Sequence, residues 1–222
     1  MKLVIANKNY SSWSLRPWLL LRHADIPFEE ERVSFLDPEF SARVRRHSPT
    51  GKVPVLVDGA LVVWDSLAIC EYVAERFAQH QLWPSDAAAR ATARSVCAEM
   101  HAGFAALRSQ MPMNVSATLP GLGWSETVQK DVERISAMWR GLRARFGADG
   151  PFLFGRFSVA DAYYAPVVFR FATYRPPLPA SAADYVQTML ALPAMRAWGE
   201  AAAQENEFVP EDEPYRSGPV SV

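Results

Sequence analysis

The first eighty residues alternate between short apolar runs and amphipathic stretches, a pattern that predicts strands alternating with helices. Residues 3–6 form an apolar run of strand length that ends at a polar segment. Serines within residues 11–14 can cap a helix through residues 15–21, with Pro17 in its first turn, where proline is tolerated. Residues 28–33 predict a second strand, and a short helix is expected after it.

A hairpin signal follows in the same part of the chain. Residues 54–57 and 61–64 are apolar and flank Asp58-Gly59, a pair typical of tight turns between antiparallel strands. A helix is expected to start directly afterwards at Asp65-Ser66. The resulting order, β-α-β-α-β-β-α, combines a parallel pair with an added hairpin. We therefore predict an α+β domain over residues 1–80, not a doubly wound sheet.

Beyond residue 81 the strand patterns stop and helical spacing takes over. Apolar residues recur at three- and four-residue intervals in four segments, which predict helices at 96–111, 132–146, 158–171 and 193–203. The third helix opens with a capping-box sequence from Ser158 to Asp161. The acidic, proline-rich tail after Phe208 is expected to lie along the surface. These patterns predict an all-helical domain over residues 88–222.

Composition and charge narrow the classes of function. The chain has 222 residues, with 23 Lys and Arg against 24 Asp and Glu, so its net charge of −1 gives no support to nucleic-acid binding. No continuous apolar run is long enough to span a membrane, and the first residues are too short for a signal sequence. Cys70 and Cys97 lie in apolar helix patterns without metal-ligand spacing. We expect a cytoplasmic protein that binds neither metal nor membrane.

Three short segments can carry chemistry, and the first is the serine-rich junction before the first helix. Ser11, Ser12 and Ser14 can cap the helix, or one of them can donate a hydrogen bond to a bound thiolate. A free thiol has a pKa of about 8.5. Lowering that pKa to about 6.5 requires roughly 2.7 kcal/mol of preference for the charged form. One charge-assisted hydrogen bond and a helix N-terminus together supply stabilisation of this size.

The other two segments flank the predicted hairpin. Pro54 is either an ordinary first-strand proline or a cis proline that exposes the backbone of Val53 to an extended peptide. Asp65 and Ser66 either cap the next helix or hold an α-amino acid head group, with Ser66 and nearby amides on its carboxylate and Asp65 on its ammonium. Each segment alone leaves both interpretations open.

Taken in order, these segments resemble the glutathione transferase superfamily over nearly the whole chain. The sequence from Ser11 to Arg16 is similar to the first β-α-β unit of the serine-type classes, particularly zeta. The segment from Ser48 to Leu56 resembles the family's cis-proline turn, and Asp65-Ser66 resembles its γ-glutamyl-binding helix start. The resemblance implies a thioredoxin-like glutathione-binding domain followed by an all-α bundle.

The resemblance also implies roles for individual residues. Ser11 falls on the family's catalytic serine, whose hydroxyl stabilises the glutathione thiolate, and Ser12 is the near alternative. Tyr10 ranks lower, although other classes use a tyrosine after the first strand. Val53 would pair with the cysteinyl backbone of glutathione and Pro54 would be cis. The remaining contacts implied are Asp65 and Ser66 to the γ-glutamyl end, and Lys52, with His47 second, to the glycyl carboxylate.

We therefore expect an enzyme that directs the glutathione thiolate at a small hydrophobic electrophile, and that forms a homodimer as family members do. The acceptor pocket is expected between the domains, lined by Trp13, Phe104, Arg108, Met111 and Tyr163. No cysteine stands at position 11, which argues against thiol–disulfide exchange as the main activity.

Alternatives to conjugation stay open. A zeta-type isomerase would usually show a cysteine at Trp13 and an arginine at Thr173, whereas the arginines here are Arg170 and Arg175. A glutathione-dependent isomerase or dehalogenase would differ from a conjugating enzyme only in the acceptor pocket. A non-catalytic interaction protein with the same fold would not need the intact segments at Pro54 and Asp65. The acceptor itself cannot be named from the sequence.

Overall fold

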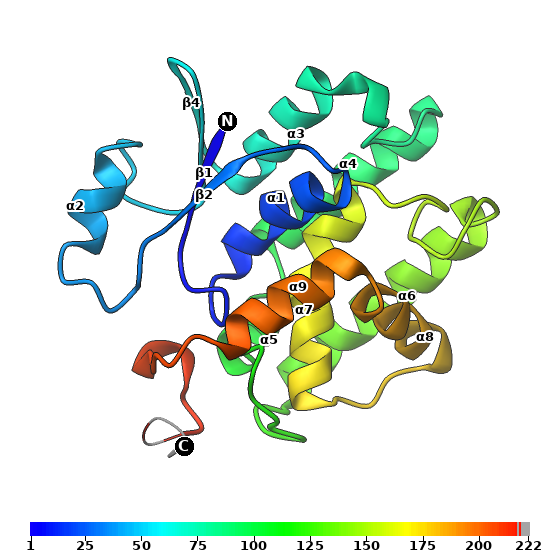
Figure 1. The fold of residues 1–222 in the computed structure, drawn as a ribbon. Coiled ribbons are helices and arrows are strands. Elements are labelled where there is room, and N and C mark those ends of the chain that lie inside the picture. The colour runs from blue at the N-terminus through cyan, green and yellow to red at the C-terminus, as the bar shows by residue number, and fades with distance from the viewer. Residues whose placement is uncertain (217, 219–222) are drawn as a thin grey trace.

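The structure is a computed structural model that describes residues 1–216 and residue 218. Its first part contains one four-stranded sheet with the strand order β2-β1-β3-β4 (Figure 1). β1 and β2 are parallel, and the other two pairs are antiparallel. The predicted order of elements and the α+β character are confirmed. The elements are β1 (Lys2–Ile5), α1 (Ser12–His23), β2 (Glu29–Arg32), α2 (Phe40–Arg45), β3 (Val55–Asp58), β4 (Leu61–Val63) and α3 (Ser66–Arg76).

The remainder of the described chain is mainly helical. The capping box at the start of α7 forms as predicted. The Ser158 side chain accepts from the backbone N–H groups of the first turn, and the Asp161 side chain accepts from the Ser158 N–H. The sequence patterns did not predict the helix α8. The elements are the 3₁₀ turn η1 (Ala78–His80), α4 (Ala87–Ala102), α5 (Ala105–Gln110), α6 (Glu126–Phe146), α7 (Val159–Tyr174), α8 (Ala180–Leu190), α9 (Pro193–Ala203) and the turn η2 (Pro210–Asp212).

The core is centred on α7, which is buried along almost its whole length and packs against α1, α4 and α8. A helix that is apolar on all sides needs neighbours all round, and α7 has them. α1 in turn packs between α3, α7 and α9. This packing holds the beginning of α1 at the junction of the sheet domain and the helices. Among the described residues, no helix is long and apolar enough to cross a membrane.

The predicted helix over residues 96–111 is wrong as one continuous element. α4 ends at Ala102 because Gly103 leaves the helical conformation, and a Cβ at that position would lie 2.8 Å from the Glu99 carbonyl oxygen. Phe104 follows with φ +57, which turns the chain before α5 begins. The turn allows Arg108 to face the first part of the molecule, where its guanidinium lies 4.7 Å from the Trp13 ring.

Two further expectations need correction at α1. The helix begins at Ser12, so Pro17 lies in its interior and not in its first turn. Ser11 occupies the N-cap position but makes no side-chain capping hydrogen bond, and Ser14 accepts from the Ala6 N–H instead of capping. In the described chain, therefore, no side chain caps the first turn of α1, and the positive end of the helix stays available to an anion.

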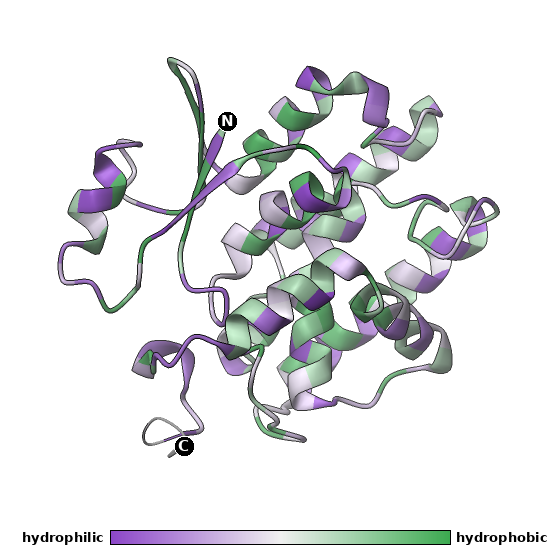
Figure 2. Ribbon diagram, viewed as in Figure 1, coloured by the Kyte–Doolittle hydropathy of each residue, from purple (hydrophilic) through white to green (hydrophobic). Residues whose placement is uncertain are grey.

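β2 forms from an unexpectedly polar sequence, and Figure 2 shows it as a mostly hydrophilic ribbon beside the more hydrophobic β1. Its glutamates find partners on neighbouring elements. Glu30 accepts from the Lys8 ammonium and the Trp18 indole, and Glu31 accepts from the Lys2 ammonium. These pairings explain how an edge strand without apolar alternation is held in the sheet.

Candidate active site

The start of α1 brings two of the three serines, Ser11 and Ser14, into contact in a buried position. Ser11 is 5% exposed, and its hydroxyl donates to the Ser14 hydroxyl oxygen at 2.7 Å. Ser14 also accepts from the Ala6 N–H at 3.3 Å, so its own proton is not used in either bond. Rotation of the two hydroxyls would reverse the bond and release the Ser11 proton to an external acceptor. Ser12 is more exposed and lines the neighbouring cavity.

A buried cation lies directly beneath this turn. The Arg16 side chain is 1% exposed, and its guanidinium carbon lies 3.9 Å from the Trp13 ring centroid and 4.3 Å from that of Tyr163. Burial lowers the pKa of Arg16 to about 10. One of its nitrogen atoms is buried and has no hydrogen-bond partner among the described residues. Because Arg16 stays protonated at neutral pH, it adds positive charge beneath the first turn of α1.

The turn before β3 leaves a backbone segment available for pairing. The Val53–Pro54 peptide is cis, as the resemblance implies. Val53 is half-buried, and in the described chain its N–H and C=O form no backbone hydrogen bond. A partly buried backbone without pairing is suited to an extended peptide ligand. Lys52 beside it is exposed, with no side-chain hydrogen bond within the described residues.

The start of α3 combines both interpretations of Asp65-Ser66. Asp65 caps the helix through a 3.0 Å bond from the Leu67 N–H, and its other carboxylate oxygen lies 3.2 Å from Nε2 of His101. Ser66 is fully buried, and its hydroxyl lies 3.0 Å from the Tyr163 hydroxyl. Nδ1 of His101 is 2.8 Å from the same Tyr163 oxygen. The four side chains therefore form a network that joins α3 to α4 and α7.

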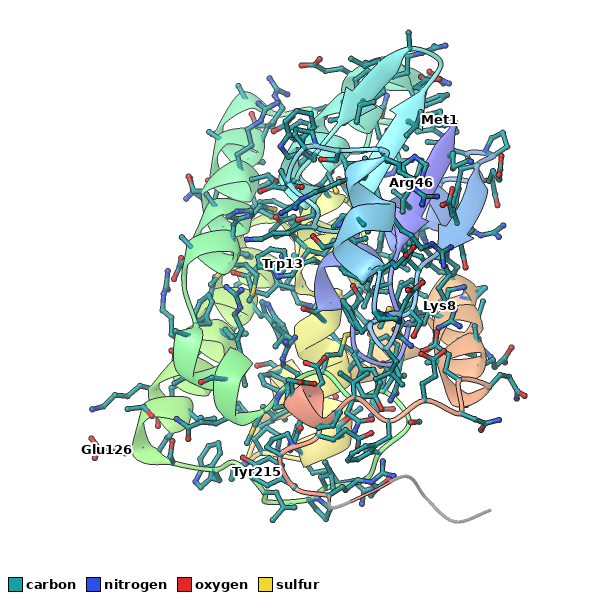
Figure 3. All side chains as sticks on the ribbon, turned by 90° about the vertical axis from the view of Figure 1, so that its left-hand side faces the viewer. Met1, Lys8, Trp13, Arg46, Glu126 and Tyr215 are labelled. Carbon is teal, nitrogen blue, oxygen red and sulfur yellow. The ribbon has the colours of Figure 1, made fainter. Side chains whose placement is uncertain are left out.

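Neither His101 nor this role of Tyr163 was predicted from the sequence, because each contact spans more than thirty residues. The imidazole also connects the two helix starts. The Trp13 ring at the start of α1 lies 5.1 Å from the His101 ring, and Nε2 of the same ring contacts Asp65 at the start of α3. Figure 3 shows Trp13 between the strands of the first part and helices α4 and α5. The first turns of α1 and α3 thus lie on either side of one histidine.

A cavity of about 460 Å³ opens beside this turn, between the two parts of the chain. Trp13 and Arg108 line it as predicted, whereas Phe104, Met111 and Tyr163 do not. The side chain of Arg170 also reaches the cavity from α7, and its Nε donates to the Met111 carbonyl oxygen at 2.8 Å. Burial lowers the pKa of Arg170 to about 9, and the nearby Arg16 and Arg108 lower it further. The cavity beside α1 is therefore electropositive.

Two residues considered from the sequence take no part in the His101 network, although Tyr10 lines the cavity. The Tyr10 hydroxyl donates to Oε1 of Glu213 at 2.5 Å and also lies 2.9 Å from the Glu207 carbonyl oxygen. Burial and the contact with Glu213 raise the pKa of the Tyr10 phenol, which makes it a poor proton donor to a thiolate. His47 contacts Glu31 at 3.1 Å and faces β2.

For the glutathione-binding role that the resemblance implies, we expect His101→Ala to raise KM for glutathione about tenfold while kcat at saturating glutathione changes much less. The substitution removes the partner of Asp65 and leaves the Tyr163 hydroxyl with one neighbour fewer, at a cost of about 1.4 kcal/mol. Steady-state kinetics with glutathione as the varied substrate measure the effect. His80→Ala is the matched control. His80 is exposed in η1, which follows the C-terminal end of α3, whereas His101 contacts the first turn of that helix. Equal KM values for all three proteins would exclude the role given to His101.

A thioredoxin-like sheet with a cis-proline turn, followed by a helical domain packed on its first helix, defines the cytosolic glutathione transferase type of fold. Comparison with known families agrees. Residues 10–76 match the model "Glutathione S-transferase, N-terminal domain", and residues 124–201 match "Glutathione S-transferase, C-terminal domain". The chain belongs to the glutathione S-transferase family, and the prediction of a glutathione transferase-type enzyme is confirmed at this level.

Individual relatives place the chain near the zeta class. It is 28% identical to a glutathione S-transferase zeta class protein of Euphorbia esula over 99% of this chain and 95% of that protein. It is 30% identical to a probable maleylacetoacetate isomerase of Caenorhabditis elegans over 57% of this chain and 59% of that protein. A dichloromethane dehalogenase of Methylorubrum extorquens is 46% identical, but over only 24% of this chain and 19% of its own length.

Solved structures show the same fold. A glutathione transferase homolog from Burkholderia with bound glutathione has a TM-score of 0.70 at 22% identity, covering 92% of this chain and 98% of that one. A maleyl pyruvate isomerase, described as a zeta-class bacterial glutathione S-transferase, has a TM-score of 0.65 at 22% identity, covering 94% and 100%.

Proposed function

We propose that this chain binds glutathione across the first turns of α1 and α3 and activates its sulfur as a thiolate. The observation that carries the proposal is the position of His101, which contacts Asp65 and lies against the Trp13 ring. It brings a helix start suited to an amino-acid head group close to a helix start suited to a sulfur anion. Val53, with its unpaired backbone, supplies the middle of a binding site for a tripeptide.

In this proposal each end of glutathione meets groups of matching chemistry. The γ-glutamyl carboxylate accepts from the Ser66 hydroxyl and the amides of the first turn of α3, and its ammonium pairs with Asp65. The cysteinyl backbone pairs with Val53, and Lys52 reaches the glycyl carboxylate. The thiolate then accepts a hydrogen bond from Ser11, with Ser12 as the near alternative. The helix end and Arg16 add positive potential that favours the sulfur anion.

The thiolate attacks an electrophilic carbon of the second substrate. With a nitro-activated aryl halide, the thiolate adds to the ring carbon and the displaced electron pair is held by the ring and its nitro group. The carbon–halogen bond then breaks, and the halide leaves with its bonding electron pair. Binding both reactants side by side supplies the orientation, and the lowered thiol pKa supplies the nucleophile. The acceptor lies in the cavity beside Trp13 and Ser12.

A glutathione-dependent isomerase is the second candidate, and the arginines of the cavity favour it. Arg108 and Arg170 give the cavity positive charge that attracts a carboxylate on the acceptor. Nε and Nη1 of Arg170 donate to backbone carbonyl oxygens, so Arg170 can offer its Nη2 to the acceptor. One relative with partial coverage is a probable maleylacetoacetate isomerase. The dehalogenase relative matches over a short segment, so its name adds little about the acceptor. Conjugation and isomerisation share the thiolate and differ in the fate of the acceptor.

Two measurements separate these proposals from a non-catalytic protein of the same fold. We expect millimolar glutathione to raise the melting temperature, since a ligand that binds only the folded state stabilises it. We also expect the protein to convert a neutral aryl chloride in the presence of glutathione, which is measured as the release of chloride. No stabilisation together with no turnover would favour an interaction protein. Stabilisation without conjugation, but with cis–trans conversion of an unsaturated dicarboxylic acid, would favour the isomerase.

We further infer a homodimer, as the resemblance implies. Leu61 and Trp64 are large apolar side chains exposed on and just after β4, at 46% and 43%. Trp64 directly precedes Asp65, so a partner at this edge of the sheet would cover the region beside the γ-glutamyl site. Light scattering should give twice the chain mass, and a mass equal to one chain would contradict the inference.

A further inference from the structure

The described part of the chain after α9 lies mostly along the surface, as predicted for the tail after Phe208, but hydrogen bonds anchor it to the rest of the fold. It crosses from the helices to the loop before α1, and Figure 1 shows it as the orange-to-red segment that leaves α9. The Glu205 carboxylate accepts from the Lys8 N–H at 2.8 Å and the Asn9 N–H at 3.0 Å. The Glu207 carboxylate accepts from the Asn7 side-chain amide at 2.8 Å. We call residues 205–215 the strap.

The strap is fixed at both sides of the cavity beside Trp13. On one side, buried Glu213 receives the Tyr10 hydroxyl at 2.5 Å, and a nitrogen of Arg216 lies 2.7 Å from its other oxygen. On the other side, the Tyr215 hydroxyl donates to the Gln110 carbonyl oxygen of α5 at 2.7 Å. The Tyr10 hydroxyl also lies 2.9 Å from the Glu207 carbonyl oxygen, so the anchors at Tyr10 and Gln110 fix residues 207–215, with Asp212 among them, beside the cavity.

Asp212 is the strap residue that lines this cavity, together with Arg108 and Arg170. Within the described residues its carboxylate makes no hydrogen bond and no ion pair closer than 4.0 Å, so it acts on the arginines through space. Burial raises the pKa of Asp212 to about 6, while Arg170 opposes the rise. At neutral pH the group is therefore mostly ionised and offsets part of the positive potential of the two guanidinium groups.

We propose that the strap is the acceptor-selecting wall of the active site, and that Asp212 limits the preference of Arg108 and Arg170 for negatively charged acceptors. This inference rests on the proposed function and assigns a residue that sets acceptor specificity. Asp212 faces an anionic acceptor as a like charge, which weakens its binding, whereas a neutral acceptor of the same shape is unaffected. The strap leaves the glutathione contacts at Val53 and Ser66 untouched.

A matched pair of aryl chlorides tests the inference. 4-Chloro-3-nitrobenzoate carries one negative charge, and its methyl ester is neutral with the same leaving group. We expect Asp212→Asn to raise the ratio of kcat/KM for the acid to kcat/KM for the ester about fivefold, the effect of removing one partly screened charge. KM for glutathione should stay as in the wild type. The shift should shrink in high salt.

Two variants accompany Asp212→Asn. Glu211→Gln removes the same charge one residue away, on an exposed side chain that does not line the cavity, and should change the ratio less than twofold. Tyr215→Phe leaves all charges in place but releases the strap from α5, and should shift the ratio about twofold in the same direction as Asp212→Asn. Circular dichroism and the melting temperature confirm that each variant is folded.

The outcomes separate this inference from the proposed function. Suppose that the wild type converts the ester but Asp212→Asn leaves the acid-to-ester ratio of kcat/KM unchanged. That result overturns the role of Asp212 and leaves the transferase proposal standing. If Glu211→Gln changes the acid-to-ester ratio as much as Asp212→Asn does, the effect comes from net charge alone, and the role of Asp212 is also overturned. If the wild type neither binds glutathione nor converts either chloride, the proposed function fails first.

Discussion

Replacing Ser11 with alanine is expected to lower kcat/KM for conjugation about 13-fold at pH 7, because the bound thiol would then ionise only near pH 8.2. The wild-type hydroxyl and the start of α1 are proposed to bring the thiol pKa from about 8.5 to about 6.5, a difference of roughly 2.7 kcal/mol. Loss of the hydroxyl removes the hydrogen bond to the anion, and the site is buried enough for that bond to be strong, since Ser11 is 5% exposed. Steady-state rates against pH measure the change.

The dependence on pH gives this prediction a second signature. Above a pH of about 8.5 the thiol ionises without help, so the variant should recover most of the wild-type rate there. Ser12→Ala is the matched control, because Ser12 is one residue away and half-buried at the cavity. A large loss in Ser12→Ala with normal turnover in Ser11→Ala would transfer the role to Ser12. Normal turnover in both would remove the serines from the mechanism.

Replacing Asp161 with alanine is expected to cost about 4 kcal/mol of the free energy of unfolding. The carboxylate is fully buried and accepts from the Leu153 N–H, the Ser158 N–H, the Ser158 hydroxyl and the Tyr185 hydroxyl. Alanine leaves these donors without their acceptor and removes the capping box of the central helix. Guanidinium unfolding measures the loss, and the melting temperature should fall by about 10 °C.

The control for this variant is Asp184→Ala in α8, an exposed aspartate whose removal should change stability by less than about 0.5 kcal/mol. The pH dependence has a defined sign. Burial raises the pKa of Asp161 to about 6 from its ordinary value of 3.8, so its contribution to stability is full below about pH 4 and declines as pH rises through 6. The variant should lack this decline. A variant as stable as the control would contradict the prediction.

The fold was predictable where local signals and packing agree. The hairpin at Asp58-Gly59 and the box at Ser158–Asp161 are short sequence signals whose partners lie within a few residues. The break at Gly103 and Phe104 was missed because the spacing of apolar residues continues across it. A carboxylate on α6, Asp131, accepts from the Leu107 N–H near the start of α5, and such a partner is not visible in sequence spacing.

The site was predictable only as separate segments. The sequence pointed to Ser11, Pro54 and Asp65-Ser66, but could not show what faces them from the second part of the chain. His101 and Tyr163 look like ordinary helix residues until α4 and α7 pack against α3's first turn. The tail gives a similar example. Its acidic, proline-rich composition predicts a segment along the surface, and most of its described residues are at least partly exposed, but composition does not show that Glu213 is buried against the Tyr10 hydroxyl.

The central claim is that the start of α1 stabilises a sulfur anion, and a titration of enzyme-bound glutathione tests it most directly. The ultraviolet absorbance of the thiolate reports its ionisation in the binary complex, without any acceptor present. We predict a pKa of about 6.5 for the bound thiol and a rise to about 8.2 in Ser11→Ala, in which the helix end and Arg16 still favour the anion. A bound thiol that ionises in the wild type only near 8.5 would contradict the account.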